Sequence, residues 1–433
     1  MRRFELVIGL SLAVGSLGQA QERRVVTLGE AIALSAEVNP TVIQARGTVR
    51  TTGAGVRSAK GSYLPSLNGD ISGGSSFSDG PSRLDPITGE LLPGRVKSQS
   101  VGLGVSGNLE IFTGFRRGAE VRAARGLEDK ADADLAEAVA QSTLQVSNDF
   151  YAALSSSELV AVRRETVRRA EEQLAIAVAK LATRAANVSD SLRALVQLGE
   201  ARLQLVSEEA RLAAAEATLA QRVGLSGRVS ARRDASLDVP GAPIDEATLL
   251  QEALARSPSV LAGEASVRSA QASVSAAKAG YLPRLILSGS YQFNGNNQNS
   301  YELFTNRRVS LGISWPLFNG FRREEQVVQS QVSLDNERGR LANARRQVES
   351  RLAAQFAALD AAEQRISLTQ LSVTAARADV TVALERYRLG SIGIVDLNSA
   401  QAGLTRAEEG AVSARFEYLR ARAEISAILG RPL

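Results

Sequence analysis

The chain has 433 residues and a net charge of +5, and it contains neither cysteine nor histidine. This composition excludes a disulfide framework, thiol chemistry and the usual ligands of zinc or copper. Without those side chains, general-base and nucleophile arrangements reduce to carboxylates or lysine, and none of these clusters in the sequence, so we predict neither an enzyme nor a cofactor site. The positive charge is not gathered into a basic stripe with interleaved aromatics, which argues against nucleic-acid binding.

Residues 1–20 have the pattern of a secretory signal peptide. An apolar run from Leu6 to Leu17 follows a basic start, and Gly18 and Ala20 place small residues before a cleavage point at Gln21. The alternative is an N-terminal membrane anchor, but the run is too short to span a bilayer. We therefore expect an exported protein.

The remainder is a tandem repeat. The block Ser58–Leu67, which contains Tyr-Leu-Pro, recurs as Ala276–Leu285, and the block Phe112–Arg117 recurs as Phe318–Arg323. We assign the first repeat to residues 21–225, a linker rich in Pro, Gly and Arg to 226–245, and the second repeat to 246–433.

Each repeat is predicted to begin with one helix of moderate length that ends at Tyr-Leu-Pro, followed by a β-hairpin at about 66–112 or 284–318. The strands alternate between apolar residues and small polar ones, as in Val309, Leu311, Ile313, Trp315 and Leu317. This period of two is typical of a membrane barrel, with a soluble sandwich as the alternative. Four strands cannot close a barrel, so the pattern predicts an oligomer in which several chains contribute strands, and three copies would supply twelve.

A very long helix and a return helix are predicted to complete each repeat. No proline occurs between Pro93 and Pro240 or between Pro316 and Pro432, which leaves room for long helices. The segment from Gly114 to Arg184 would form a helix of roughly 100 Å at ~1.5 Å per residue. Its apolar residues recur at coiled-coil spacing: Val167, Ala170, Leu174, Ala177 and Leu181.

These features resemble the TolC family of outer-membrane factors over essentially the whole mature chain. The most specific similarity lies in Glu385–Asn398, with Ala414–Tyr418 and Leu429–Gly430 behind it. The resemblance implies a mixed α and β membrane protein, a homotrimer with a coiled-coil α-barrel and a twelve-stranded β-barrel. It also implies an outer-membrane location with a periplasmic extension, contact with outer-membrane lipid, and partnership with a periplasmic adaptor and an inner-membrane pump in efflux or type I secretion.

The resemblance places an adaptor-contact tip at Leu389, Gly390 and Ser391, where the long helix must reverse. Gly390 also suits a simple helix C-cap. In the first repeat Arg184 stands where this glycine would be expected, which puts an equivalent second adaptor contact in doubt.

The resemblance further suggests a periplasmic aperture formed by Asp396, Tyr387 and Asp190. Three copies of Asp396 would make an acidic ring, while the alternative is a carboxylate that caps the return helix. The basic partner that the family pattern places after the glycine is Ile392 here, and Ser399 replaces a second aperture carboxylate. We therefore expect a thin closing network.

Phe115, Arg116, Phe321 and Arg322 mark the junctions between strand and helix. An aromatic ring and a guanidinium suit a membrane interface, and ordinary surface arginine is the alternative. For the whole chain, a secreted trimeric coiled-coil stalk or adhesin is the competing function, although it leaves the hairpins unexplained. A periplasmic adaptor would need lipoyl-like all-β segments, which are absent from the sequence.

Overall fold

The computed structural model describes residues 24–84, 87, 89–92, 94–184, 187–234, 245–297 and 300–433. The predicted signal peptide at 1–20 lies outside these residues. Among the described residues, no helix combines the length and the apolar character needed to cross a membrane.

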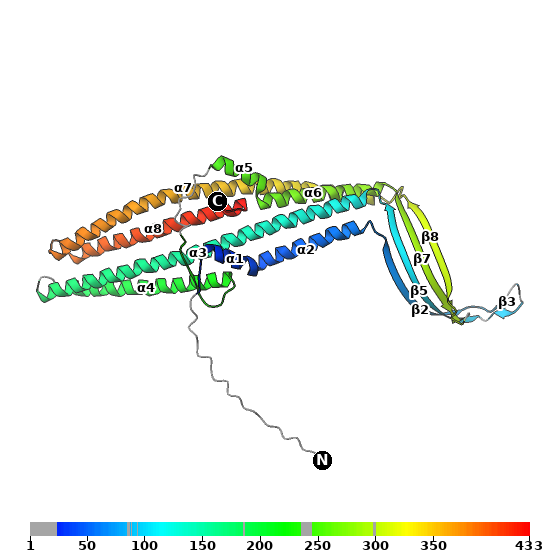
Figure 1. Ribbon diagram of the computed structural model, residues 1–433, viewed down its shortest axis with the longest axis horizontal. Coiled ribbons are helices and arrows are strands. Elements are labelled where there is room, and N and C mark those ends of the chain that lie inside the picture. The colour runs from blue at the N-terminus through cyan, green and yellow to red at the C-terminus, as the bar shows by residue number, and fades with distance from the viewer. Residues whose placement is uncertain are drawn as a thin grey trace, which may run out of the picture. The chain divides into compact units, whose positions relative to one another are not determined.

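The two repeats contain the same elements in the same order (Figure 1). The first has α1 (Leu28–Val38), α2 (Pro40–Gly61), β2 (Ser66–Asp79), β5 (Arg95–Phe112), α3 (Arg116–Ala182) and α4 (Val188–Arg222). The second has α5 (Glu246–Arg256), α6 (Pro258–Lys278), β7 (Arg284–Asn296), β8 (Phe304–Ser314), α7 (Arg322–Arg388) and α8 (Ile394–Leu429). The tandem repeat and the long helices are thus confirmed, and α3 and α7 have 67 residues each.

The prediction of one helix before each hairpin was wrong, because two helices meet there in both repeats. Asn39 and Ser257 have extended backbone, with ψ of 119° and 137°, and each stands directly before a proline. Proline disfavours the helical conformation in the residue that precedes it and fits the first turn of a new helix. Pro40 and Pro258 therefore start α2 and α6.

Four antiparallel strands form one sheet in the order β2-β5-β7-β8. The register places odd-numbered residues on one face: Leu103 lies between Ile71 and Phe293, and Leu287 is paired with Leu311. Strand β8 ends at Ser314, earlier than the predicted boundary near residue 318, because Pro316 has no N–H to continue a ladder. A short pair, β3 (Arg83–Leu84) and β4 (Leu91–Leu92), lies within the first hairpin.

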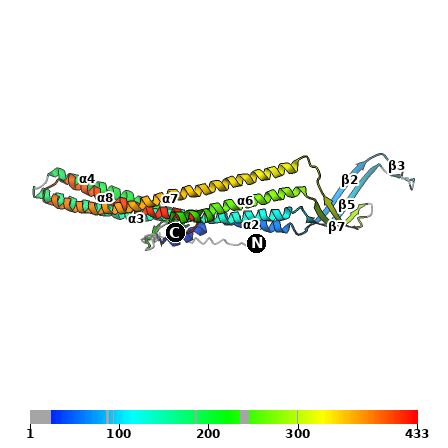
Figure 2. The ribbon, with the colours of Figure 1, turned by 90° about the horizontal axis from the view of Figure 1, so that it is seen from above.

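The chain divides into two compact units, and each takes segments from both repeats. One unit contains the chain up to Ile43 with residues 137–253 and 349–433, and the other contains Gln44–Ala136 and Leu254–Val348. Within the first unit α4 lies along α3 and α8 lies along α7 (Figures 1 and 2). The second unit holds the four-stranded sheet.

The core of the first unit joins the repeats through large apolar side chains. Phe150, Leu219 and Phe416 are buried in one cluster with Val26 and Val229. The last two belong to strands β1 (Arg24–Val26) and β6 (Val229–Ala231), which pair in parallel. Part of the predicted linker at 226–245 is therefore a strand, because the buried side chain of Val229 holds β6 against the core.

Candidate functional site

The chain reverses between α7 and α8 through an exposed glycine turn. Gly390 has a φ of 77°, a left-handed conformation that glycine adopts without steric cost. Its N–H donates to the carbonyl oxygen of Tyr387 at 3.1 Å, and the N–H of Ser391 donates to that of Arg386 at 2.8 Å. Leu389 is 80% exposed. The three predicted tip residues thus lie together on an open surface.

The equivalent turn between α3 and α4 uses a residue with a side chain. Arg184 has a φ of 58°, where a side chain costs about 1–2 kcal/mol. Its N–H donates to the carbonyl oxygen of Leu181 at 3.0 Å. The two reversals therefore share a backbone form but present different side chains.

Tyr387 is buried at the base of the α7–α8 turn. Only 2% of it is exposed, and it packs with Ala177, Ala194, Ile394 and Leu397. Burial raises the pKa of its hydroxyl, and the charge of Asp190 raises it further. The Tyr387 hydroxyl has no hydrogen-bond partner among the described residues.

Lys180, in the last turn of α3, is a basic partner of Tyr387 that the sequence reasoning missed. Its ammonium nitrogen lies 4.4 Å from the centre of the Tyr387 ring and donates to the carbonyl oxygen of Tyr387. A cation over an aromatic face is attracted by the ring quadrupole. From the sequence we expected a thin closing network, because Ile392 stands where the family pattern has a basic residue. In the structure a basic residue of the other repeat, Lys180, contacts Tyr387 instead.

Asp396 and Asp190 are repeat mates with different surroundings. Asp396 is exposed and accepts a hydrogen bond from the Gly393 N–H at 3.2 Å, so it caps the first turn of α8. Asp190 occupies the first turn of α4 and lies close enough to Tyr387 to influence its pKa. The structure thus brings Asp190 and Tyr387 together, and gives Asp396 the capping hydrogen bond of the alternative hypothesis.

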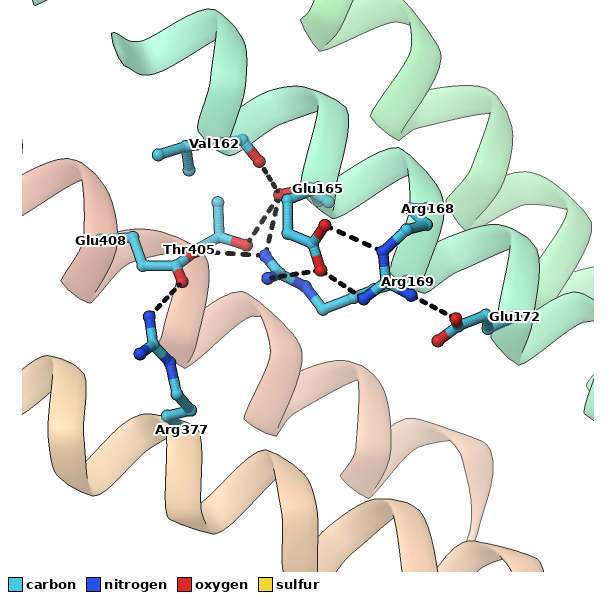
Figure 3. A network of polar contacts seen from close by, with 9 residues as sticks. Val162, Glu165, Arg168, Arg169, Glu172, Arg377, Thr405 and Glu408 are labelled. Carbon is cyan, nitrogen blue, oxygen red and sulfur yellow. Dashed lines mark hydrogen bonds and ion pairs between the residues drawn. The ribbon is translucent and has the colours of Figure 1, made fainter.

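A polar seam joins α3 to α7 and α8 within the same unit (Figure 3). The carboxylate of Glu408 in α8 forms ion pairs with Arg169 of α3 at 3.3 Å and with Arg377 of α7 at 3.4 Å. The Arg169 and Glu408 side chains are only 11% and 14% exposed. Such a shielded ion pair is costly to break by removing one partner. The seam therefore fixes α3 against the α7–α8 pair.

The seam continues toward the helix reversal through an amide pair. Gln173 of α3, which is buried, donates to the side-chain oxygen of Asn398 in α8. Residues of one repeat thus bond to residues of the other at successive levels of α3. No local sequence signal marks these pairs, since their members lie more than two hundred positions apart.

The strand-to-helix junctions have the same unusual backbone in both repeats. Phe115 and Phe321 have φ values of 67° and 64°, and their rings are 74% and 69% exposed. Each ring makes an edge-to-face contact, Phe115 with Phe112 and Phe321 with Phe318. Arg322 is exposed, whereas Arg116 is engaged by Glu110 at 3.0 Å and Glu120 at 2.8 Å.

The second arginine of each junction is structural, which the sequence reasoning also missed. Arg117 donates to the carbonyl oxygens of Ser62 and Ile111 at 3.0 and 2.9 Å and lies over the Tyr63 ring. Arg323 donates to those of Pro316 and Leu317 and lies over the Tyr281 ring. The sequence signal that could have revealed this role was the repetition of Arg-Arg after each hairpin, together with Tyr-Leu-Pro before it.

Comparison with known proteins agrees with this architecture. The sequence pattern described as "Outer membrane efflux protein" matches residues 31–225 and 249–431, one stretch in each repeat. Protein CyaE of Bordetella pertussis is 27% identical over 380 residues, which cover 86% of this chain and 77% of CyaE. The pyoverdine export outer membrane protein OpmQ of Pseudomonas aeruginosa is 25% identical over 343 residues, which cover 77% of this chain and 70% of OpmQ.

The crystal structure of the outer membrane protein VceC of Vibrio cholerae has the same fold. It superposes with a TM-score of 0.76 at 16% identity and covers 94% of this chain and 96% of VceC. The fold class is that of the trimeric channels of this family, in which long helices form an α-barrel and strands form a β-barrel. The chain belongs to the outer membrane efflux protein family: it is an efflux channel of the outer membrane with a periplasmic helical extension, and it is not an enzyme.

Proposed function

We propose that three copies of this chain form the exit duct of a tripartite efflux or type I secretion system. In this proposal an inner-membrane pump delivers the substrate, and a periplasmic adaptor joins the pump to the channel. The export role named for OpmQ, a relative over most of the chain, supports it. The competing stalk or adhesin hypothesis does not account for the sheet.

The main observation in support of this proposal is that the four-stranded sheet is open. Among the residues that the structure describes, strands β2 and β8 each pair on one side only, and the odd-numbered face holds large exposed apolar side chains such as Ile71, Leu311 and Ile313. Unpaired strand edges are not tolerated in lipid. Pairing of β8 with β2 of the next copy satisfies both edges and directs the apolar face toward lipid.

Exposed apolar stripes on two helices support the same assembly. On α4 the stripe contains Val188, Leu192, Val196, Leu203 and Val206, and on α7 it contains Leu368, Leu371 and Val382. Spacings of three, four, seven and eleven residues place each set on one helix face. Exposed apolar patches of this kind mark protein interfaces, and a second copy is the partner that the sheet also requires.

The helix reversals would then form the periplasmic entrance. The Lys180–Tyr387 contact and Asp190 would hold the closed aperture, while three Asp396 carboxylates would present negative charge around it. Leu389, Gly390 and Ser391 would meet the adaptor, and the exposed rings of Phe115 and Phe321 with Arg322 would lie at the membrane interface. Arg116, engaged by two carboxylates, would contribute less there.

Two measurements test the proposal. Native mass spectrometry of the detergent-purified protein should give three chains, and a monomer would contradict the assembly. A photoreactive amino acid at Ser391 should crosslink in cells to a periplasmic protein that copurifies with an inner-membrane transporter. The same amino acid at Gln326, an exposed position near the start of α7, should not. A trimer without that specific crosslink would leave a channel but exclude the adaptor contact at this tip.

A further inference from the structure

The apolar face of the sheet changes character toward the hairpin turns. Along β8, Ile313, Leu311 and Val309 are followed on the same face by Arg307. In the other hairpin, Lys97 stands opposite Phe77, on the turn side of Leu103 and Ile71. Each hairpin thus carries a cation on its apolar face beyond the aliphatic residues, and the first also carries Arg95, which is paired with Asp79.

Both cations lie over aromatic rings. The guanidinium of Arg307 is 5.0 Å from the centre of the Tyr291 ring and donates to the Tyr291 hydroxyl at 3.3 Å. The ammonium of Lys97 is 5.5 Å from the centre of the Phe77 ring. All four side chains are exposed or nearly so, so most donors of the two cations point into the surroundings.

The face offers these cations no carboxylate. Among the odd-numbered residues of β2, β5, β7 and β8 the sole acid is Asp79, and Arg95 holds it at 3.0 Å. A lipid-facing cation is costly near the hydrocarbon, and long basic side chains extend to the headgroups instead. An anion from the membrane itself is therefore the partner that this surface requires.

The turn ends of the strands are expected on the outer-leaflet side of the membrane. Strands β5 and β8 run directly into α3 and α7 at their other ends, and the long helices of this family extend into the periplasm. We propose that Lys97 with Phe77, and Arg307 with Tyr291, bind the phosphate groups of outer-leaflet lipids. Guanidinium and ammonium groups bind phosphate by charge-assisted hydrogen bonds, and the rings suit the interface. The inference rests on the lipid-facing assignment of the odd-numbered face.

The chain offers a matched control in the neighbouring residue. Arg308 follows Arg307 in β8 and therefore points to the opposite face. Arg307→Gln and Arg308→Gln remove the same charge one position apart, so a difference between them reports the face and not the net charge.

The test uses the intact trimer in phosphatidylcholine vesicles that contain either bisphosphorylated lipid A or the same lipid stripped of its phosphates. Wild-type trimers should dissociate at a higher temperature with the phosphorylated lipid, and native mass spectrometry should show that lipid bound. Lys97→Gln with Arg307→Gln should weaken lipid A binding roughly thirtyfold, whereas Arg308→Gln should leave it unchanged.

Three results would overturn the proposal. Equal stabilisation of wild type by both lipids would do so even if the double variant failed to assemble. Equal losses in Arg307→Gln and Arg308→Gln would remove the face dependence. Loss of trimer by Arg307→Gln in stripped lipid would assign the cation to a carboxylate of the next copy. Failure of trimerisation in wild type would instead count against the proposed assembly.

Discussion

The ammonium nitrogen of Lys180 lies 4.4 Å from the centre of the Tyr387 ring. Lys180 lies in the last turn of α3 in the first repeat and Tyr387 in the last turn of α7 in the second, so one contact joins the ends of two long helices. Lys180 also donates to the carbonyl oxygen of Tyr387, which it shares with the Gly390 N–H. Any opening that separates these helix ends must break both interactions.

Lys180→Met should therefore loosen the closed aperture more than Tyr387→Phe does. Methionine keeps an apolar stem but loses the cation and its hydrogen bond, a loss of about 1–2 kcal/mol. Phenylalanine keeps the ring and removes a hydroxyl without a hydrogen-bond partner among the described residues. Single-channel conductance should rise clearly for Lys180→Met. Arg386→Gln, at the exposed repeat mate of Lys180, is the control, and an equal rise there would assign the effect to net charge.

Alkaline pH should destabilise the aperture through Tyr387. Its pKa in the folded protein is raised, mainly by burial and secondarily by Asp190. The neutral phenol is thus favoured, and its contribution to stability is complete below the unfolded pKa of about 10 and is lost as pH rises through the folded pKa. Asp190→Asn should lower that pKa. The pKa of Tyr387 is measured from the difference in tyrosinate absorbance between the wild type and Tyr387→Phe during a pH titration. A pKa at the ordinary value would contradict the buried environment.

Substitutions at Asp396 should separate capping from an acidic ring. Asp396→Ala removes both the acceptor of the Gly393 N–H and the charge, and should cost about 0.5–1 kcal/mol of helix stability. Asp396→Asn keeps an acceptor and removes only the charge. If three carboxylates line the aperture, both variants should reduce cation preference in planar bilayers at low salt, where screening is weak. Unchanged selectivity in both would leave Asp396 a cap alone.

The strand register predicts which arginine substitutions block assembly. Leu311→Arg or Ile313→Arg places a charge on the lipid face and should cost about 2–4 kcal/mol near the midplane. Ser314→Arg and Ser310→Arg place the charge on the other face and should be tolerated better. On that face the hydroxyl oxygens of Ser310 and Ser288 lie 3.2 Å apart. Trimer yield on unheated gels measures the difference. Equal yields for all four variants would contradict the register.

Local patterns in the sequence were sufficient to predict the long helices and the strands of this protein. Proline spacing predicted the long helices, and alternation in Val309, Leu311 and Ile313 predicted the strand and its apolar face, because periodicity follows from backbone geometry alone. The repeated motifs located the junctions, and the resemblance to the TolC family placed the reversal at Gly390. The same local rule could have warned of the break at Asn39 and Pro40, which the sequence reasoning passed over.

Partners across the repeats were decided only by the tertiary structure. Lys180 meets Tyr387, Arg169 meets Glu408 and Gln173 meets Asn398 because α3 packs on α7 and α8, and the spacing of residues within each helix carries no information about that packing. The different roles of Asp190 and Asp396 have the same cause: identical side chains at equivalent repeat positions face different neighbours. A sequence specifies which side chains share one helix face, whereas the packing of helices distant in the chain determines which charge, ring or carbonyl that face meets.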